Sequence, residues 1–327
     1  MRQREGNKFS KGWTTVRDLL CAGELNVDLV LSGFHSMPVQ GREIMGEDYT
    51  LCLGSSSANC CCVAASLGLS ALFYGKLGQD HFGQVAMEGL ERYGVDTRLI
   101  RRDPGWRTGL TVCVSATGDR AMATCFGDTI DAFDALDVPL EEADARHIHM
   151  ASYFFQPRVR ARLPILYKRA KTMGMTTSLD AGWDEQGRWE EGLVEALSVT
   201  DFFFPNESEA CAIAGTDNVQ RAARYIAALG TNAVVKCGEK GTLLCTREGE
   251  VLEAPPYRTV VVETTGAGDS FNAGFLYAYL RGMSLDQCLR FGNAAGAVSV
   301  TRIGGTTACP TLAEVQRVME QGTTEGL

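Results

Sequence analysis

The 327-residue sequence lacks the features that mark several large classes of protein. It contains no run of about 18 apolar residues, which is the length that a membrane-spanning helix needs. Lysine and arginine (31) are fewer than aspartate and glutamate (40), and no basic patch is interleaved with aromatic residues. A nucleic-acid partner is therefore not expected. No GxGxxG fingerprint follows the first predicted strand, which leaves a dinucleotide-dependent oxidoreductase as a weak alternative.

The cysteines also lack the spacing of a metal site. None of the twelve forms a paired CxxC motif, and Cys60, Cys61 and Cys62 are adjacent. This distribution argues against a disulfide framework and predicts reduced thiols in the core of a cytoplasmic protein. The first 15 residues are polar and have no apolar segment of the kind found in secretory signals. We expect an N-terminal tail over 1–17, one domain over 18–320 and a C-terminal tail over 321–327.

The most informative stretch is ETTGAGDSFNAGF, Glu263 to Phe275. The β-branched run 260–262 precedes it and predicts a strand, and the small residues 266–268 predict a turn. From Asp269 onward, apolar residues recur at helical spacing. The first N–H groups of a helix have no intrahelical partner and lie at the positive end of the helix dipole. Because no bulky side chain blocks them here, the pattern predicts an anion-binding turn between a strand and a helix.

Asp269 lies in the first turn of this predicted helix, where its carboxylate would repel a bound anion. General-base catalysis gives one reason for its position, since it would accept the proton of a hydroxyl that attacks a phosphoryl group. The alternative is a first-turn acid that only interacts favourably with the helix dipole. Residue chemistry alone leaves both interpretations open.

The string TTGAGDSFNAGF closely resembles the second signature of the ribokinase-like sugar kinases, the PfkB carbohydrate kinase family. The stretch LGSSSAN is similar to the first signature, with Ser55 where a second glycine is usual. The resemblance extends over nearly the whole chain. It implies an α/β fold: a ribokinase-like three-layer α/β/α core with a mostly parallel sheet, and a small β-sheet lid from segments of about 30–53 and 107–127.

Polar groups follow several predicted strands in the second half of the chain. From residue 146 onward strands and helices alternate, which predicts right-handed crossovers and a parallel sheet. Asp180, Asn206 and Lys236 each come at the end of one of these strands. Because ligands bind at the carboxyl edge of such sheets, we expect these groups at a binding site, although each alone is also compatible with ordinary capping.

The resemblance implies roles for individual residues. Asp269 would be the base, and the N–H groups of Gly266, Ala267 and Gly268 would form the anion hole. The substrate-binding residues would be Asp28, Gly54, Ser55, Asn59, Thr108, Arg120 and Asp180. The residues that bind the nucleotide and its phosphates would be Asn206, Glu209, Lys236, Gly238, Gly241 and Asn293, with Lys236 adding a charge where the family often has threonine. Glu209 would act on magnesium through water, and Glu263 and Thr265 would lie at a monovalent-cation site.

The implied activity is transfer of the γ-phosphoryl group of ATP to a hydroxyl, expected to be primary, of a sugar or sugar acid, as in a fructokinase, a ribokinase or a 2-keto-3-deoxygluconate kinase. Mg²⁺ and, as in many family members, K⁺ would assist. One alternative is a nucleoside kinase, with Phe34, Trp106 or Phe126 as a stacking group. Another is a non-catalytic sugar-binding regulatory protein, against which Asp269 argues. The partners would be the sugar and ATP, with a homodimer through the exposed edges of the lid.

Overall fold

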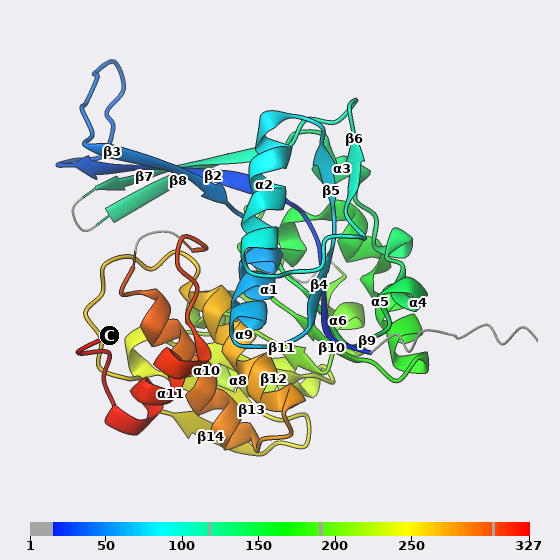
Figure 1. The fold of residues 1–327 in the computed structure, drawn as a ribbon. Helices are drawn as coiled ribbons and strands as arrows, with labels where there is room; N and C mark the ends of the chain where they lie inside the picture. The colour runs from blue at the N-terminus through cyan, green and yellow to red at the C-terminus, as the bar shows by residue number, and fades with distance from the viewer. Residues whose placement is uncertain (1–15, 117–118, 190–191, 303–304) are drawn as a thin grey trace, which may run out of the picture.

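The computed structural model describes residues 16–116, 119–189, 192–302 and 305–327. Its centre is an eight-stranded sheet with the order β14-β13-β12-β11-β10-β9-β1-β4 (Figure 1). Neighbouring strands from β12 to β4 are parallel, whereas β13 and β14 are antiparallel additions at one edge. The strands of this sheet are β1 (Arg17–Ala22), β4 (Ala71–Tyr74), β9 (Ala145–Met150), β10 (Thr176–Leu179), β11 (Phe202–Phe203), β12 (Asn232–Lys236), β13 (Thr242–Cys245) and β14 (Val251–Ala254).

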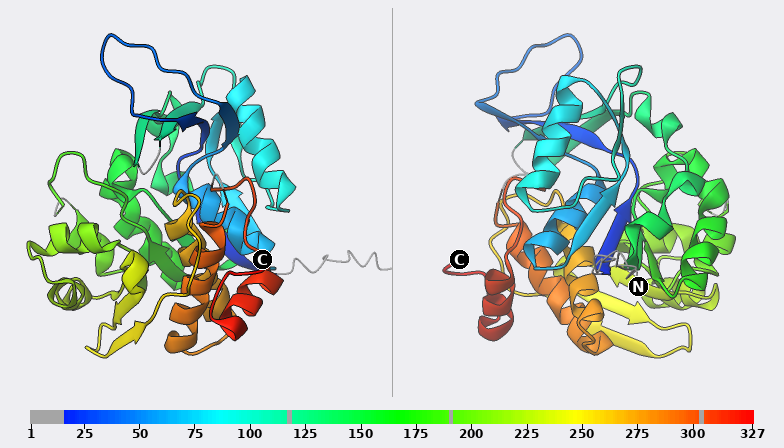
Figure 2. Two further views of the ribbon diagram at one scale, coloured as in Figure 1. Left: turned by 90° about the vertical axis from the view of Figure 1, so that its left-hand side faces the viewer. Right: turned by 45° about the vertical axis from the view of Figure 1, so that its right-hand side comes forward.

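Helices cover both faces of this sheet, because alternate residues of its strands are apolar on both sides (Figure 2). In β1, Leu19 and Cys21 pack into one hydrophobic cluster, and Leu20 and Ala22 into the other. The first cluster includes α1 (Ser56–Ser66), α2 (His81–Arg92), α9 (Ala267–Leu280), α10 (Leu285–Ser299) and α11 (Leu312–Gln321). The second includes α4 (Leu140–Ala143), α5 (Pro157–Thr172), α6 (Leu193–Leu197), α7 (Glu207–Ala214) and α8 (Val219–Ala228). The predicted three-layer α/β/α core is confirmed.

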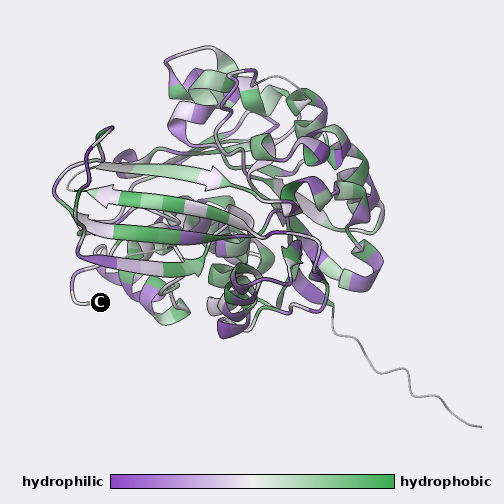
Figure 3. Cartoon of the chain, turned by 90° about the horizontal axis from the view of Figure 1, so that it is seen from above, coloured by the Kyte–Doolittle hydropathy of each residue, from purple (hydrophilic) through white to green (hydrophobic). Residues whose placement is uncertain are grey.

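A second, four-stranded sheet with the order β3-β2-β7-β8 projects from one end of the core (Figures 1 and 3). Its strands are β2 (Asn26–Phe34), β3 (Asp48–Leu53), β7 (Gly109–Ala116) and β8 (Asp119–Cys125). It is the predicted lid, although its first strand begins at Asn26 rather than near residue 30. The remaining short elements are β5 (Lys76–Gly78), β6 (Arg101–Asp103), α3 (Thr129–Ala132), and the 3₁₀ turns at Ala135–Asp137, Tyr153–Phe155 and Gly238–Lys240.

The predicted strand over 260–262 is wrong. These three valines lie in the connection between β14 and α9, and their exposed fractions are 69, 53 and 55%. The N–H groups of Val262 and Glu263 donate to the carbonyl of Val300, at 2.8 and 3.2 Å, where α10 ends. The segment therefore caps a helix end instead of entering a sheet, because β-branched residues form strands only where neighbouring strands pack against them.

The two predicted tails differ in what the structure describes. Residues 1–15 of the N-terminal segment lie outside the described residues, and Arg17 already pairs with Ala145 in the central sheet. At the other end, the N–H of Thr324 donates to the carbonyl of Arg258 at 2.9 Å, and the Thr324 side chain is buried. All twelve cysteines are free thiols. Among the described residues, no helix has the length and apolar character to cross a membrane.

Helices α9 and α10 approach closely at a glycine. A Cβ atom added to Gly274 would lie 2.7 Å from the Cβ of Ala295 and 3.0 Å from the carbonyl oxygen of Phe291. At Gly296, also helical, the nearest atom to an added Cβ would be the carbonyl oxygen of Ala267 at 3.4 Å, an ordinary contact. Gly274 therefore sets the spacing of the helix that carries Asp269.

We expect Gly274→Ala to lower the free energy of unfolding by about 1–3 kcal/mol, because the added methyl forces α9 and α10 apart. Gly296→Ala is the matched control. It should raise the free energy of unfolding by up to about 1 kcal/mol, because alanine has the higher helix propensity and the site has room. Urea unfolding of both variants measures the difference, and equal effects of the two substitutions would contradict the packing argument.

Candidate active site

The glycine turn opens α9 as predicted. Gly266 is the N-cap of the helix with a φ of 77°, a left-handed conformation that glycine adopts without steric cost. No side chain caps this helix end. The N–H of Ala267 donates to the carbonyl of Thr264 at 3.2 Å, so this predicted anion-hole donor is engaged within the turn. The helix N-terminus still offers the remaining first-turn N–H groups and the positive end of the dipole to an anion.

Asp269 is hydrogen-bonded to a residue from the other end of the chain. Its Oδ2 accepts a hydrogen bond of 3.0 Å from Nδ2 of Asn59, which lies on α1. Burial, reinforced by the charge of Asp180, raises the pKa of the Asp269 carboxyl to about 7, although Asn59 and Lys236 oppose this shift. A pKa near neutrality suits a general base, because the group is then both ionised and basic at working pH.

Asp28, Gly54, Ser55, Asn59 and Asp269 form one continuous series of contacts, which we call the acceptor row. An added Cβ at Gly54 would lie only 2.3 Å from Oδ1 of Asp28, so only glycine fits beside this carboxylate. Ser55 follows as the N-cap of α1, and its Oγ accepts a hydrogen bond from the N–H of Ala58. Asn59 then continues the row to Asp269. The structure thus brings together five of the predicted site residues from three parts of the chain.

The lid holds the outer end of the acceptor row. Nδ2 of Asn26 donates to Oδ1 of Asp28 at 3.2 Å and to Oγ1 of Thr111 at 3.0 Å. Burial raises the pKa of Asp28 to about 6, the hydrogen bonds from Thr111 and Asn26 lower it, and the charge of Glu263 raises it further. Glu263, predicted to lie at a monovalent-cation site, is therefore close enough to Asp28 for their charges to interact.

A buried ion pair lies beside the glycine turn. Nζ of Lys236, at the end of β12, is 2.6 Å from Oδ2 of Asp180, at the end of β10. Nδ2 of Asn272 donates to the same Asp180 oxygen at 2.7 Å. Burial alone would raise the pKa of Asp180, but the charge of Lys236 holds it below the usual value. An added Cβ at Gly268 would lie 3.3 Å from Nζ, so the ammonium lies against the predicted anion hole.

Asn206 and Glu209 form a capping box at the start of α7. Oδ1 of Asn206 accepts from the N–H of Glu209, and Oε2 of Glu209 accepts from the N–H of Asn206, both at 2.8 Å. Asn206 and Glu209 therefore cap the helix, which was one of the two interpretations of this residue pattern. Burial, and then the charge of Asp180, raise the pKa of Glu209 to about 7. The backbone of Asn206 also bridges to Lys236, which places this helix start beside the ion pair.

Two of the other predicted nucleotide residues, Gly241 and Asn293, have structural contacts, whereas Gly238 lies in open space. Gly241 has a φ of 90°, and an added Cβ there would lie 2.2 Å from the carbonyl oxygen of Ala254. Asn293 donates to the carbonyls of Ala254 and Pro255 at 3.1 and 2.9 Å, which ties α10 to the end of β14. Gly238 has a φ of 55° and open space around its Cα.

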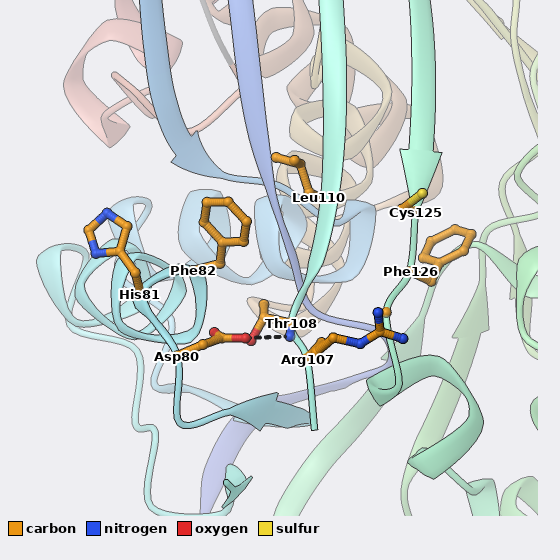
Figure 4. A pocket seen from close by; sticks show the side chains of 9 residues that line it. Asp80, His81, Phe82, Arg107, Thr108, Leu110, Cys125 and Phe126 are labelled. Carbon is orange, nitrogen blue, oxygen red and sulfur yellow. Dashed lines mark hydrogen bonds between the residues drawn. The ribbon is translucent and has the colours of Figure 1, made fainter. Parts of the chain in front are cut away.

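Thr108 lies away from the acceptor row. It lines a cavity of about 600 Å³ between α2 and the lid, together with residues such as Phe82, Leu110 and Phe126 (Figure 4). Its N–H donates to Oδ2 of Asp80 at 2.8 Å. Because strand residues alternate between faces, Leu110 and its partner Cys125 lie on the opposite face of the lid from Thr111 and Thr124. The backbone of Arg120 pairs with Ser115, but its side chain lies outside the described residues.

Sequence reasoning missed three polar residues of the site. Glu24 lies between β1 and β2, and Asn26 begins β2, in a stretch whose polar character was the available signal. Asn272 lies one helical turn after Asp269, a spacing that places both on one side of α9. Its hydrogen bond to Asp180 joins two segments that are 92 residues apart, so no local sequence pattern predicts it.

No described His, Cys, Asp or Glu residues form a group of three or more that could hold a metal ion. The two histidines of β9 are buried, and His147 and His149 both bond to Oγ of Ser178, at 2.7 and 2.8 Å. They belong to the core between β9 and α9.

The profile of the pfkB family carbohydrate kinases matches residues 16–312. The chain belongs to the PfkB family of carbohydrate kinases. An uncharacterized sugar kinase of Archaeoglobus fulgidus is 33% identical over 250 residues, which cover 75% of this chain and 96% of that protein. The ribokinase of Haemophilus influenzae is 26% identical over 93% of this chain and 99% of its own length. The 5-dehydro-2-deoxygluconokinase of Shouchella clausii is also 26% identical, over 97% of this chain and 98% of that protein.

Solved structures give the same answer for the fold. The ribokinase of Arabidopsis thaliana, complexed with ribose and ATP, has a TM-score of 0.82 and 25% identity, covering 94% of this chain and 99% of that one. This member of the PfkB family is therefore a sugar kinase, a phosphotransferase with an alcohol group as acceptor. The predicted family, fold and enzyme class are confirmed.

Removing the Asp269 carboxylate should stabilise the folded chain at high pH. The folded pKa of about 7 lies above the ordinary value for aspartate, about 3.9, so the native state holds its proton more tightly than the unfolded chain. The contribution of Asp269 to wild-type stability therefore falls as pH rises from about 4 to about 7, and Asp269→Asn abolishes this loss. We expect the melting temperature of the variant to exceed that of wild type by more at pH 8 than at pH 5. Asp48→Asn, which removes an exposed lid carboxylate, is the control, and a pH-independent difference for Asp269→Asn would refute the assignment.

Breaking the buried ion pair should be costly, and removing both charges should be less so. Lys236→Met leaves Asp180 buried without its cation, for which we expect a loss of about 3–5 kcal/mol in the free energy of unfolding. The double variant Lys236→Met with Asp180→Asn should regain most of this loss, because no uncompensated charge stays behind. Urea denaturation of the two single variants and the double variant measures the coupling. Additive losses would show that the two side chains do not act as a pair.

Proposed function

We propose that this sugar kinase transfers the γ-phosphoryl group of ATP to a hydroxyl, a primary one, of an acceptor bound along the acceptor row. One observation carries the proposal. Asp269 lies in the first turn of a helix whose N-terminus has no side-chain cap, and its carboxylate is hydrogen-bonded to Asn59 of the row. The site for an anion and the site for a hydroxyl compound therefore meet at one carboxyl group, whose pKa is about 7.

The residues of this site have separate tasks in the proposed reaction. Asp269 accepts the proton of the attacking hydroxyl, while Asn59 holds the carboxylate toward it. The N–H groups at the start of α9 and the ammonium of Lys236 stabilise negative charge on the transferring group. Asn206 and Glu209, beside Lys236, would lie toward the phosphates of ATP and its Mg²⁺. Bound Mg²⁺ supplies charge neutralisation of those phosphates.

The chemistry of the residues present fits an anionic nucleotide. Lys236 provides a cation beside Gly268, where the missing side chain leaves backbone N–H groups accessible. The lid extends over the other end of the acceptor row and would reduce the access of water, which competes with the sugar as acceptor. Potassium activation and a dimer through the lid are further parts of this proposal.

The decisive test is ADP release from Mg-ATP over a panel of sugars, sugar acids, polyols and nucleosides, with K⁺ or Na⁺ as the monovalent cation. We expect acceptor-dependent turnover, and a fall in kcat of about 10²–10⁴-fold in Asp269→Asn because the base is lost. For wild type, kcat/KM should rise with pH through about 7, as Asp269 ionises. A wild-type protein that binds a panel member but releases no ADP with any of them would favour a binding protein over a kinase. A nucleoside as best acceptor would redirect the substrate assignment.

A further inference from the structure

Asn59 presents an unused hydrogen-bond acceptor within the row. Because its Nδ2 donates to the Asp269 carboxylate, the orientation of the amide is fixed and Oδ1 points to the other side. Asn59 is 5% exposed, and Oδ1 has no hydrogen-bond partner among the described residues. Buried acceptors normally have a donor. A hydroxyl can supply that donor, whereas a carboxylate has none to give.

Glu24 lies directly behind the row and is 4% exposed. Its carbonyl accepts a hydrogen bond of 2.7 Å from Oγ of Ser55, and its Oε2 has no partner in the described part of the chain. Burial raises the pKa of its carboxyl to about 8, against the hydrogen bonds of Ser152 and Ser55. Both serines have a positive φ, 56° for Ser152 and 73° for Ser55. Backbone strain of this kind persists where surrounding contacts hold it and is concentrated at functional sites.

The charges along the row are negative at both ends. Asp28 and Asp269 are carboxylates, and Glu263 lies close enough to Asp28 to raise its pKa. Lys236 is paired with Asp180 beside Gly268, at the anion-hole end. Arg107, on the lid, is exposed and forms an ion pair of 2.8 Å with Asp128. Neither of these two cations is directed by its contacts to the row, and the side chain of Arg120 lies outside the described residues. Against the described side chains of the row, a bound carboxylate would meet like charges.

We propose that the phosphoryl acceptor of this kinase is an uncharged polyhydroxy compound and that the acceptor row disfavours sugar acids. The inference rests on the proposed kinase function and refines its substrate class. Hydroxyl groups satisfy Asn59 Oδ1 as donors and can also donate to Asp28 at the lid end. Glu24, held neutral behind the row, avoids adding a third charge next to Asp269.

The test uses paired compounds in which an uncharged group at C1 is replaced by a carboxylate. D-fructose and 2-keto-D-gluconate differ by a CH₂OH or COO⁻ group at C1 and keep the same terminal hydroxyl, and D-ribose with D-ribonate gives a second pair. For the full-length protein, we expect the best acceptor to be uncharged and its kcat/KM to exceed that of its acid by at least about tenfold, equivalent to about 1.4 kcal/mol. The ligand-induced rise in melting temperature, measured with the same compounds, gives a readout that does not depend on turnover.

Variants locate the origin of the discrimination. Asp28→Asn should reduce the neutral-to-acid ratio of kcat/KM by about tenfold or more, because a like charge is removed from the row. Asp48→Asn removes an exposed carboxylate from the same lid and should leave the ratio unchanged. The inference would be overturned if wild type preferred the acid members of the pairs. It would also be overturned if the neutral compounds were not phosphorylated and did not raise the melting temperature. If no acceptor is phosphorylated, the kinase proposal fails, and the melting-temperature shifts still decide between neutral and acidic ligands.

Discussion

The hydrogen bond between Asn59 and Asp269 is the contact on which the rest of the site depends. It spans 210 residues of sequence and connects α1, which carries the acceptor row, to α9, which begins at the glycine turn. The two helices pack against each other on the same face of the central sheet. Close packing of α9 on α10 at Gly274 fixes the second helix in turn. In the proposed reaction, a shift in either helix would separate the residues that bind the hydroxyl compound from the helix N-terminus that binds the anion.

The carboxyl groups of the site have different pKa values because their surroundings differ. Asp180 has a cation at 2.6 Å and a pKa below its usual value, so it remains an anion. Asp269 and Glu209 are buried near that anion, and their pKa values rise to about 7. The Lys236 ion pair thus keeps Asp180 ionised, and the resulting charge helps to make Asp269 basic. Pairs of acids whose pKa values are moved apart in this way are typical of acid–base catalysis.

The sequence predicted the parts of this arrangement that are local. The alternation of strands and helices after residue 146, the lid segment over about 107–127 and the glycine turn depend on neighbouring residues, and the structure contains all three. The predicted strand over 260–262 is absent, and the N–H groups of Val262 and Glu263 instead donate to the carbonyl of Val300 at the end of α10. The pairing of Lys236 with Asp180 links two strand ends 56 residues apart, which only the folded sheet brings together. The face of the lid on which Thr108 lies could have been predicted from the sequence. Alternate residues of a strand share a face, so Thr108 lies on the same side as Leu110 and on the opposite side from Thr111.

Ser55 replaces the second glycine that is usual in the family, and the structure accommodates this serine. With a φ of 73° and a ψ of 124°, it has a positive φ that glycine adopts without steric cost, and the cost for serine is of order 1–3 kcal/mol. Its hydroxyl offsets this cost, because it caps α1 and also donates to the carbonyl of Glu24. A glycine would relieve the backbone and lose both hydrogen bonds. Serine therefore fastens the end of β1 to the acceptor row, next to the neutral carboxyl group that lies behind it.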